Sequence, residues 1–194
     1  MIDCKKTENY FKERKRMCDR SGCNGCPLSS YLNGTNKTCR VFENCYPNKA
    51  MVIACHSCSF KCDKMSGKQV CQNGTLANQP NIEISIDSIV NRYLSNILSR
   101  AIVFGGLEPF DDIANVIAVI KKLRNNGNND DVVIYTGYTE VEIIKMWNKE
   151  YEKLKQYPNI IIKYGRFIPD EKSHLDPILG IELASSNQYA KKIS

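Results

Sequence analysis

Short apolar runs recur along the chain from residue 51 onward, and amphipathic stretches separate them. A run of four or five apolar residues between polar segments is typical of a buried strand. Four runs fit this pattern and are predicted to be strands: Met51–Ala54, Ala101–Phe104, Val132–Tyr135 and Ile160–Lys163. Ile82–Ile86, in which apolar and polar residues alternate, is predicted to be a further strand.

The stretches between these runs have the periodicity of helices. One helix is predicted near Ser88–Leu98, with Asp87 as its N-cap, and another over Glu140–Trp147. A further helix begins at Asp111 and Asp112, and its apolar residues recur at helical spacing: Ile113, Val116, Ile117, Ile120 and Leu123. Alternating strands and helices build a parallel sheet with helices packed across it, so we expect an α/β fold. Ligands in such folds bind at the carboxyl ends of the strands.

The length of 194 residues and the hydrophobic content of 42% suit one well-buried domain with a small appendage, since domains run to about 100–150 residues. No stretch approaches the roughly 18 consecutive apolar residues of a membrane span, and the start of the chain lacks the apolar stretch of a signal peptide. We therefore expect a cytosolic, or cytoplasmic, protein. Ten cysteines in a reducing compartment favour metal or cluster ligation over a disulfide framework.

The cysteines divide the chain into two parts. Six of them precede Pro47, and the other four lie within residues 55–71. The domain boundary is therefore predicted near Tyr46–Ala50, with a Cys-rich head over residues 1–46 and a second domain over residues 50–194.

The Cys-rich head is basic and contains a candidate zinc site. Residues 1–49 hold ten Lys or Arg against five Asp or Glu, a surplus of five within a net charge of +6. A solvated helix face at Lys12–Arg16 explains this charge more simply than nucleic-acid binding does. Four cysteines have the number and compact spacing of a structural zinc site: Cys18, Cys23, Cys26 and Cys39. An auxiliary cluster and unliganded thiols are the alternatives, and Cys4 or Cys45 could replace a ligand.

Three cysteines follow the first predicted strand of the second domain. Cys58 and Cys62 enclose three residues, and Cys71 ends the loop. Three thiolates on one loop can bind a cubane iron–sulfur cluster and leave one iron open to a small molecule. Gly105 and Gly106 follow another predicted strand, where a ligand can approach the backbone closely. Unliganded thiols and an ordinary tight turn are the alternatives at these two places.

Five motifs occur in order along the second domain: CSFKC with CQN (58–62 and 71–73), FGGLEPF (104–110), YTGYT (135–139), GRFI (165–168) and ASSNQ (184–188). Together they resemble a radical S-adenosylmethionine (SAM) protein, specifically the activating protein of anaerobic (class III) ribonucleoside-triphosphate reductase. The resemblance covers residues 50–194. It implies a partial (β/α) barrel-like parallel sheet of the radical SAM type.

The resemblance also implies roles for particular residues. Cys58, Cys62 and Cys71 match the three cysteines that hold a [4Fe-4S] cluster, whose fourth iron is expected to chelate the amino and carboxylate groups of SAM. Further residues match the family's cofactor-binding turn and cleft: Gly105, Gly106, Glu108, Pro109, Thr136 and Gly137. The chemistry requires no side chain to act as an acid or a base, so no catalytic residue is named.

The sequence departs from the family pattern in two places. The family has two residues between its second and third cysteines, whereas the eight residues Asp63–Val70 separate Cys62 from Cys71, so this insert must loop out. Cys55 is a rival for the third ligand, although the polar residues after Cys71 favour Cys71. Leu107 is an extra residue within the Gly-Gly-Glu-Pro turn.

The function that the resemblance implies is reductive cleavage of SAM, which makes a 5′-deoxyadenosyl radical and then a glycyl radical on the catalytic subunit of anaerobic ribonucleotide reductase. The second expected partner is an electron donor such as a flavodoxin, and we expect neither a membrane nor a nucleic-acid partner. One alternative is another radical SAM enzyme, which activates a different glycyl-radical protein or modifies a small molecule. The other is a non-catalytic zinc-binding module. GRFI and ASSNQ favour the reductase activator, because they resemble that subfamily.

Overall fold

A computed structural model describes residues 39–40, 49–71 and 73–194, all of which belong to the unit Thr38–Ser194. The predicted head therefore lies outside the described residues, apart from the backbone of Cys39–Arg40. The candidate zinc ligands Cys18, Cys23 and Cys26 and the side chain of Cys39 lie outside them as well. Within the described ranges, no helix is long and apolar enough to cross a membrane.

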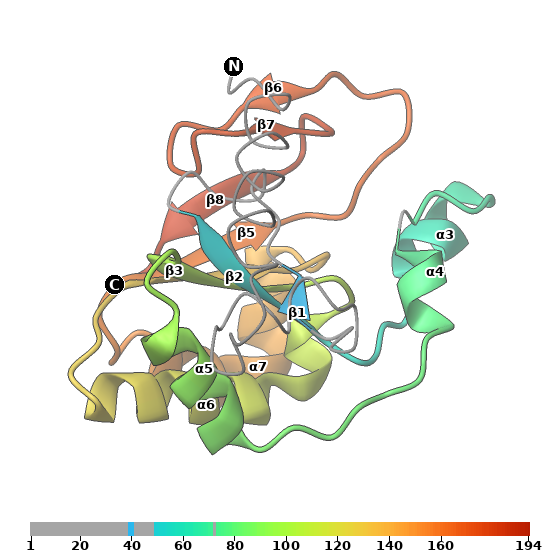
Figure 1. The fold of residues 1–194 in the computed structure, drawn as a ribbon. Coiled ribbons are helices and arrows are strands. Elements are labelled where there is room, and N and C mark those ends of the chain that lie inside the picture. Colours follow the sequence, from blue (N-terminus) through green and yellow to red (C-terminus); the bar gives the residue numbers. More distant parts are fainter. Residues whose placement is uncertain (1–38, 41–48, 72) are drawn as a thin grey trace, which may run out of the picture. The chain divides into compact units, whose positions relative to one another are not determined.

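Six strands of the described residues form one mixed sheet in the order β1-β2-β3-β4-β5-β8 (Figure 1). The four central strands are parallel, and the edge strands β1 and β8 pair antiparallel to β2 and β5. The bounds are β1 (Cys39–Arg40), β2 (Ala50–Ala54), β3 (Ala101–Gly105), β4 (Asp131–Tyr135), β5 (Ile160–Tyr164) and β8 (Tyr189–Lys192). A separate antiparallel pair consists of β6 (His174–Leu175) and β7 (Glu182–Leu183).

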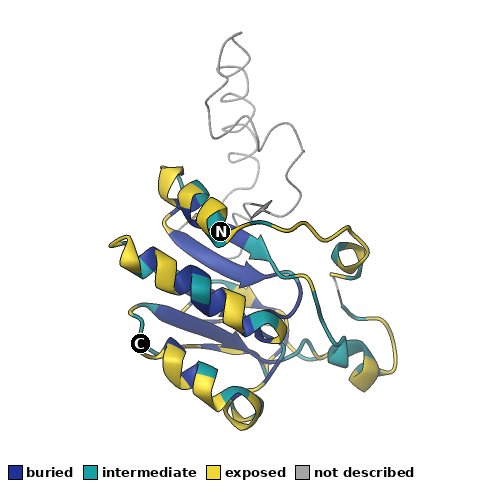
Figure 2. Ribbon diagram, turned by 90° about the horizontal axis from the view of Figure 1, so that it is seen from below, coloured by how far each residue is buried: buried dark blue, intermediate teal, exposed yellow. Residues whose placement is uncertain are grey.

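Helices connect each parallel strand to the next. Their bounds are α3 (Lys61–Ser66), α4 (Gly74–Ala77), α5 (Ile86–Ser95), the 3₁₀ helix η1 (Pro109–Asp112), α6 (Ile113–Asn125) and α7 (Glu140–Leu154). The longer helices α5, α6 and α7 all cover one face of the sheet (Figures 1 and 2). The result is a mixed α/β structure in which the central strands follow one another in chain order.

The central strands are apolar on both faces because each face has its own core. Neighbouring residues of a strand point to opposite sides, so Phe104 packs with the helices while Val103 belongs to a second cluster on the other face. Leu179 and Leu183, from the segment that contains β7, complete this second cluster. Figure 2 shows the resulting buried strands behind the amphipathic helices. Burial on both faces explains why these strands appear as unbroken apolar runs.

The strand predicted over Ile82–Ile86 is wrong. Residues 82–85 are irregular, and Ile86 is the first residue of α5. The N-cap of this helix is Ser85 rather than Asp87, because the Ser85 Oγ accepts the Ser88 backbone N–H at 3.1 Å. Apolar and polar residues alternate over 82–86, but β2 is already paired with β1 and β3 and offers no free edge to a further strand.

The helix predicted over Glu140–Trp147 is longer than expected. It continues to Leu154, although Trp147 itself has non-helical angles (φ −132°, ψ 40°). Trp147 packs against Phe110 and Tyr138, with ring centroids 5.6 and 4.9 Å away. The periodicity predicts the regular first part of the helix and stops where the helix kinks.

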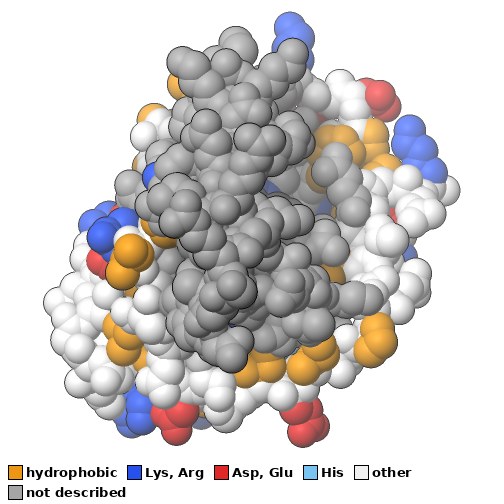
Figure 3. Space-filling model, in the orientation of Figure 1, with side chains coloured by type: hydrophobic (Ala, Val, Ile, Leu, Met, Phe, Trp, Pro, Cys, Tyr) orange, Lys and Arg blue, Asp and Glu red, His pale blue; other side chains and the backbone are white. Residues whose placement is uncertain are grey.

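The surface of the described residues is mixed in character. On the face in Figure 3, their Lys and Arg side chains are scattered among acidic and apolar ones rather than gathered into one basic patch. The most exposed large apolar side chains, Met65, Ile97, Val141 and Leu175, come from four separate segments. Single exposed apolar residues are common on soluble domains and need no special explanation.

Candidate functional site

A cavity of about 370 Å³ lies where the carboxyl ends of the parallel strands meet. Segments that follow β2, β3, β4 and β5 all contribute to its lining, and residues around β7 close it from the other face of the sheet. Three of the lining residues are Cys58, Cys62 and Cys71. The structure therefore brings the three predicted cluster cysteines to the edge of the sheet where α/β proteins bind ligands.

The three cysteines are free, partly exposed thiols that influence one another electrostatically. Burial raises the pKa of Cys62 to about 11, and the nearby Cys71, Asp63 and Cys58 contribute to this increase. Burial likewise raises the pKa of Cys58, against the effect of the Phe60 backbone N–H, which donates to its Sγ at 3.4 Å. Each thiolate makes ionisation of the neighbouring thiols less favourable. A bound metal supplies positive charge that stabilises the thiolates, so metal binding would release the thiol protons.

Cys55, the rival ligand, lies in a different environment. It does not line the cavity, and its backbone N–H donates to the Gly105 carbonyl at 2.9 Å. Burial raises the pKa of its thiol to about 12, and the acidic groups of Asp112, Glu108 and Asp111 add to the effect. These neighbours are carboxylates, whereas the neighbours of Cys58 and Cys62 include the other cavity thiols.

The thiols have the donor type that an iron–sulfur cluster takes. Among the described residues, no group of three or more His, Cys, Asp or Glu could hold one metal ion. Cysteines that ligate a cubane bind different iron atoms, so their sulfurs need not converge on one point. Cys58, Cys62 and Cys71 therefore have the donor type and the common cavity that an iron–sulfur cluster requires.

The turn after β3 forms the wall of the cavity next to the thiols. Gly106 has a φ of +76°, and a Cβ there would lie 2.7 Å from Leu76 Cδ2 and 3.2 Å from the Ala54 Cβ. Glycine is therefore required by both the backbone angle and the close packing. The extra residue Leu107 is buried and lines the cavity, and the Glu108 N–H donates to the Ser57 carbonyl at 2.8 Å. This last bond ties the turn to the segment that contains the cysteines.

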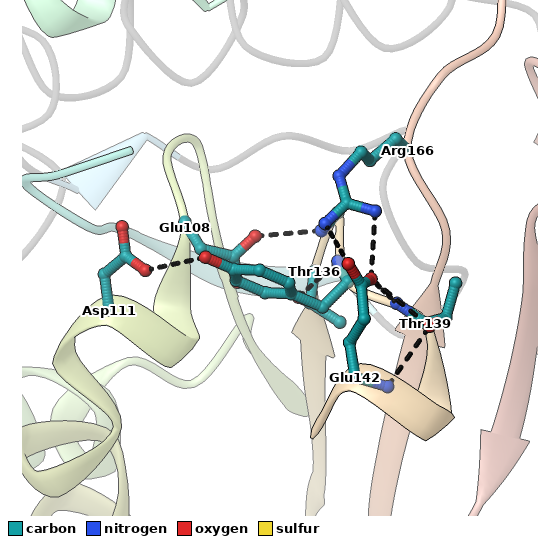
Figure 4. Close-up of polar contacts among 8 residues, drawn as sticks. Glu108, Asp111, Thr136, Thr139, Glu142 and Arg166 are labelled. Atoms are coloured by element: carbon teal, nitrogen blue, oxygen red, sulfur yellow. Dashed lines mark hydrogen bonds and ion pairs between the residues drawn. The ribbon is translucent and has the colours of Figure 1, made fainter. Parts of the chain in front are cut away.

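The Glu108 carboxylate is buried and joins the ends of β3 and β4 (Figure 4). It accepts hydrogen bonds from the Thr136 hydroxyl (2.7 Å), the Gly137 N–H (2.9 Å) and the Phe110 N–H (3.1 Å). Burial raises its pKa, and these three donors oppose the increase. The carboxylate is thus anchored by donors from the segment after β4 and from η1 rather than left free in the cavity.

The predicted cofactor-binding residues divide into two groups. Gly106, Glu108, Thr136 and Gly137 line the cavity. Gly105 and Pro109 are buried next to them, at the end of β3 and the start of η1, but do not line it.

Tyr138 connects several of the motifs. Its hydroxyl donates to Asp111 Oδ1 at 3.3 Å, and its ring lies 5.0 Å from Lys61 Nζ and 5.1 Å from the Arg166 guanidinium. Arg166 forms two hydrogen bonds of 2.9 Å with the Glu142 carboxylate, as Figure 4 shows. Burial opposes ionisation of Glu142, but the bonds from Arg166 and the Thr139 backbone outweigh it and lower its pKa to about 2.

The ASSNQ motif mainly supports the GRFI segment. The Asn187 side-chain amide donates to the Arg166 carbonyl at 2.8 Å, and the Gln188 amide donates to the Gly165 carbonyl at 3.2 Å. Gly165 has a φ of +95°, and a Cβ there would lie 2.9 Å from the Asn187 carbonyl oxygen. Five motifs that are far apart in sequence thus form or support one cavity.

Sequence reasoning missed a buried lysine in this cavity. Lys163 is 9% exposed, lines the cavity and donates from Nζ to the Gly165 carbonyl at 2.9 Å. Burial lowers its pKa to about 8, while the Glu108 carboxylate acts in the opposite direction. The available signal was a lysine that directly follows three isoleucines at a strand's carboxyl end. A charged residue at that position points to a ligand more than to packing.

Three cysteine thiols that line one cavity can ligate a cubane iron–sulfur cluster, and comparison with family models agrees with this class. The model of the 4Fe-4S single cluster domain family matches residues 22–189, and the chain therefore belongs to this family. Comparison with curated proteins and with solved structures finds no match. The protein is thus an iron–sulfur protein whose cofactor is a 4Fe-4S cluster.

Proposed function

We propose that this protein is a radical SAM enzyme that generates a glycyl radical on anaerobic ribonucleotide reductase. Cys58, Cys62 and Cys71 hold the cluster in this proposal, and the cavity beside them binds SAM. The observation that carries it is the common cavity: the three thiols, the Gly106–Glu108 turn and the end of β4 line the same space. A cluster with one open iron therefore has a ligand-sized space next to it.

The size and lining of the cavity suit SAM. Its volume of about 370 Å³ falls within the range of roughly 300–1,000 Å³ that is usual for small-molecule sites. The methionine part of SAM has an amino group and a carboxylate, and one acidic and one basic residue, Glu108 and Lys163, line the cavity. Aromatic side chains also line it, and their ring faces attract a cation such as the sulfonium: Tyr135, Tyr138 and Phe167.

The reaction needs one electron from a donor of the flavodoxin class. When bound and reduced, the cluster supplies this electron to SAM, which splits into methionine and a 5′-deoxyadenosyl radical. The radical takes a hydrogen atom from a glycine of the reductase, so the products are 5′-deoxyadenosine and a glycyl radical. The chain's own residues bind SAM, orient its sulfonium and exclude water, and none of them transfers a proton.

The fold and the motif order support the same proposal. The central strands follow one another in chain order and the longer helices lie on one face, which is the arrangement that a partial (β/α) barrel needs. The choice of ribonucleotide reductase rests on the resemblance of GRFI and ASSNQ. Activation of another glycyl-radical enzyme remains the alternative, and no specific contact in the cavity favours it.

The test is anaerobic reconstitution followed by reduction in the presence of SAM. The protein should release 5′-deoxyadenosine and methionine in equal amounts, and a co-expressed reductase subunit should acquire a glycyl radical that is visible by electron paramagnetic resonance. The Cys71→Ala variant is the matched negative control. An intact cluster that yields neither deoxyadenosine nor a partner radical would contradict the proposal. Deoxyadenosine without a radical on the reductase would contradict only the choice of partner.

A further inference from the structure

The eight-residue insert between Cys62 and Cys71 raises the question of what keeps Cys71 in the cavity. Residues 63–70 form most of α3 and a loop, and no residue of α3 is buried. An exposed loop of this length without apolar packing would order poorly by itself. The position of the third thiol must therefore depend on specific polar contacts.

Asp63 supplies these contacts with a single oxygen atom. Its Oδ1 accepts the backbone N–H of Val70 and the backbone N–H of Cys71, each at 2.8 Å. The Cys62 Sγ lies 3.7 Å from the same oxygen. One carboxylate, next in sequence to the second cysteine, thus binds the backbone of the third and closes the insert at its two ends.

Other contacts turn the chain in the middle of the insert. The Ser66 hydroxyl donates to the Lys68 carbonyl at 2.7 Å, and Gly67, the C-cap of α3, has a φ of +67°. These contacts turn the chain but do not reach Cys71. Only the Asp63 carboxylate connects the two ends of the insert among the hydrogen bonds of the described residues.

The position of Asp63 in α3 makes this use of its side chain specific. Asp63 is the third residue of a helix that has no side-chain cap, and an acidic residue there commonly bonds back to the N-cap backbone. Here the carboxylate is directed to the far end of the loop instead. Hydrogen bonds to a charged acceptor are stronger than neutral ones, which suits a loop with little packing.

We infer that Asp63 is a positioning residue, which holds Cys71 beside Cys62 so that the insert can be tolerated within the cluster-binding loop. The inference rests on the proposed assignment of Cys71 as a cluster ligand. It assigns Asp63 no contact with substrate or with iron. Its effect on the cluster passes through the backbone of Cys71.

The experiment compares the full-length variants Asp63→Ala and Asp63→Asn with Asp87→Ala. Asp87 is also an acidic first-turn residue, but it belongs to α5 and pairs with Lys122 on the surface. Hydrogen exchange of the Val70 and Cys71 amides is measured on the protein before reconstitution. Iron and sulfide content and the electron paramagnetic resonance spectrum of the reduced cluster are measured afterwards.

Asp63→Ala should exchange the Val70 and Cys71 amides at least about tenfold faster, because two hydrogen bonds to a charged acceptor are lost. Its iron content should fall severalfold, and the remaining cluster should have an altered spectrum. Asp63→Asn retains an acceptor oxygen without the charge, so it should lie between Asp63→Ala and the unmodified protein. Asp87→Ala should match the unmodified protein in every measurement.

The outcomes separate this inference from the assignment on which it rests. Full iron content in Cys71→Ala would show that Cys71 is not a cluster ligand, regardless of the results for the Asp63 variants. If Cys71→Ala loses iron but both Asp63 variants retain normal iron and an unchanged spectrum, the positioning role is overturned and the ligand assignment stands. Faster amide exchange with a normal cluster would also overturn it, because Asp63 would then order the loop without serving the cluster. The Asp63→Asn variant decides the question if Asp63→Ala fails to fold.

Discussion

The Cys loop (residues 58–71) and the Glu108 turn (residues 106–108) face the same cavity, yet they are held in different ways. Glu108 is 6% exposed and accepts three hydrogen bonds from the ends of neighbouring segments. In the Cys loop, the three cysteines are only partly buried, and α3 has no buried residue. The wall that we propose to bind SAM is preformed by the sheet, whereas the wall that we propose to hold the cluster depends on a few polar bonds.

This difference has a physical consequence for assembly. Segments with few buried apolar contacts open at low free energy, and metal binding to such a segment is coupled to its folding. We therefore expect the cluster to order the Cys loop beyond what the two Asp63 hydrogen bonds achieve alone, and the Glu108 turn to be equally ordered with and without it. The predictions below test this contrast in order of decreasing effect.

The largest effect is expected from the loss of a cluster thiol. Cys71→Ala should abolish cluster binding, because a three-thiol site cannot hold the cluster with two. Cys55→Ala is the matched control, since Cys55 lies outside the cavity, and it should retain iron and sulfide. Iron and sulfide analysis after anaerobic reconstitution measures both. Retention of a full cluster in Cys71→Ala, or its loss in Cys55→Ala, would reverse the assignment of these two thiols.

The Glu108 turn should be sensitive to crowding at Gly106. Gly106→Ala would bring a Cβ to 2.7 Å from Leu76 and 3.2 Å from Ala54 at a positive φ, and we expect a loss of about 1–3 kcal/mol in unfolding free energy. Gly127→Ala is the control, because Gly127 has the same φ of +76° with nothing within 4 Å of the added atom. Urea denaturation compares the two variants. Equal losses would mean that the backbone angle matters and the packing against Leu76 does not.

An effect of similar size is expected when the Glu108 carboxylate loses one donor. Thr136→Val removes the 2.7 Å hydrogen bond and should cost about 1–3 kcal/mol, because the carboxylate is buried. Burial already raises the Glu108 pKa above 4.5, and removing a donor raises it further.

The pH dependence of the Thr136→Val effect follows from this direction. A carboxyl whose pKa is raised by folding destabilises the protein as the pH rises from the unfolded pKa through the folded one. The cost of Thr136→Val should therefore be larger at pH 7 than near pH 4.5, as measured by urea denaturation at both values. Thr75→Val, at an exposed position in α4, is the control. A cost that is the same at both pH values would argue against an ionised Glu108.

The smallest effect concerns the ion pair between Glu142 and Arg166, which is 2.9 Å long and partly exposed. The Glu142 pKa is lowered from 4.5 to about 2, despite the opposing effect of burial. The contribution of this ion pair to the unfolding free energy should thus be present above pH 4.5 and disappear as the pH falls toward 2. Glu142→Gln can still cap α7 but should lose about 0.5–1 kcal/mol at pH 7 after allowance for solvent screening.

The measurement is thermal unfolding of the cluster-free protein between pH 7 and pH 2, and the two unfolding curves should converge at low pH. Glu152→Gln, which breaks the exposed pair with Lys155, should change little at any pH. A difference between Glu142→Gln and the unmodified protein that persists unchanged at pH 2 would show that the ion pair is not its source.

The sequence by itself determined the alternation of strands and helices and the order of the motifs. Strands such as Val132–Tyr135 could be predicted because both faces of a parallel sheet are buried and leave an unbroken apolar run. The start of α7 could be predicted as well, because its cap is local: Thr139 and Glu142 are three residues apart. The cysteine spacing pointed to a cluster, and the family match agrees with an iron–sulfur protein.

Only the tertiary structure decided how distant residues meet. Ile82–Ile86 has the alternation of a strand, yet the neighbours of β2 leave it no edge. Lys163 and Arg166 reach the cavity because β5 lies beside β4, which local periodicity cannot reveal. The eight-residue insert appeared only as a departure in spacing, and the Asp63 carboxylate that closes it acts across seven and eight residues. Helix and strand patterns depend on neighbours within one turn or one pleat, whereas these contacts depend on the path of the whole chain.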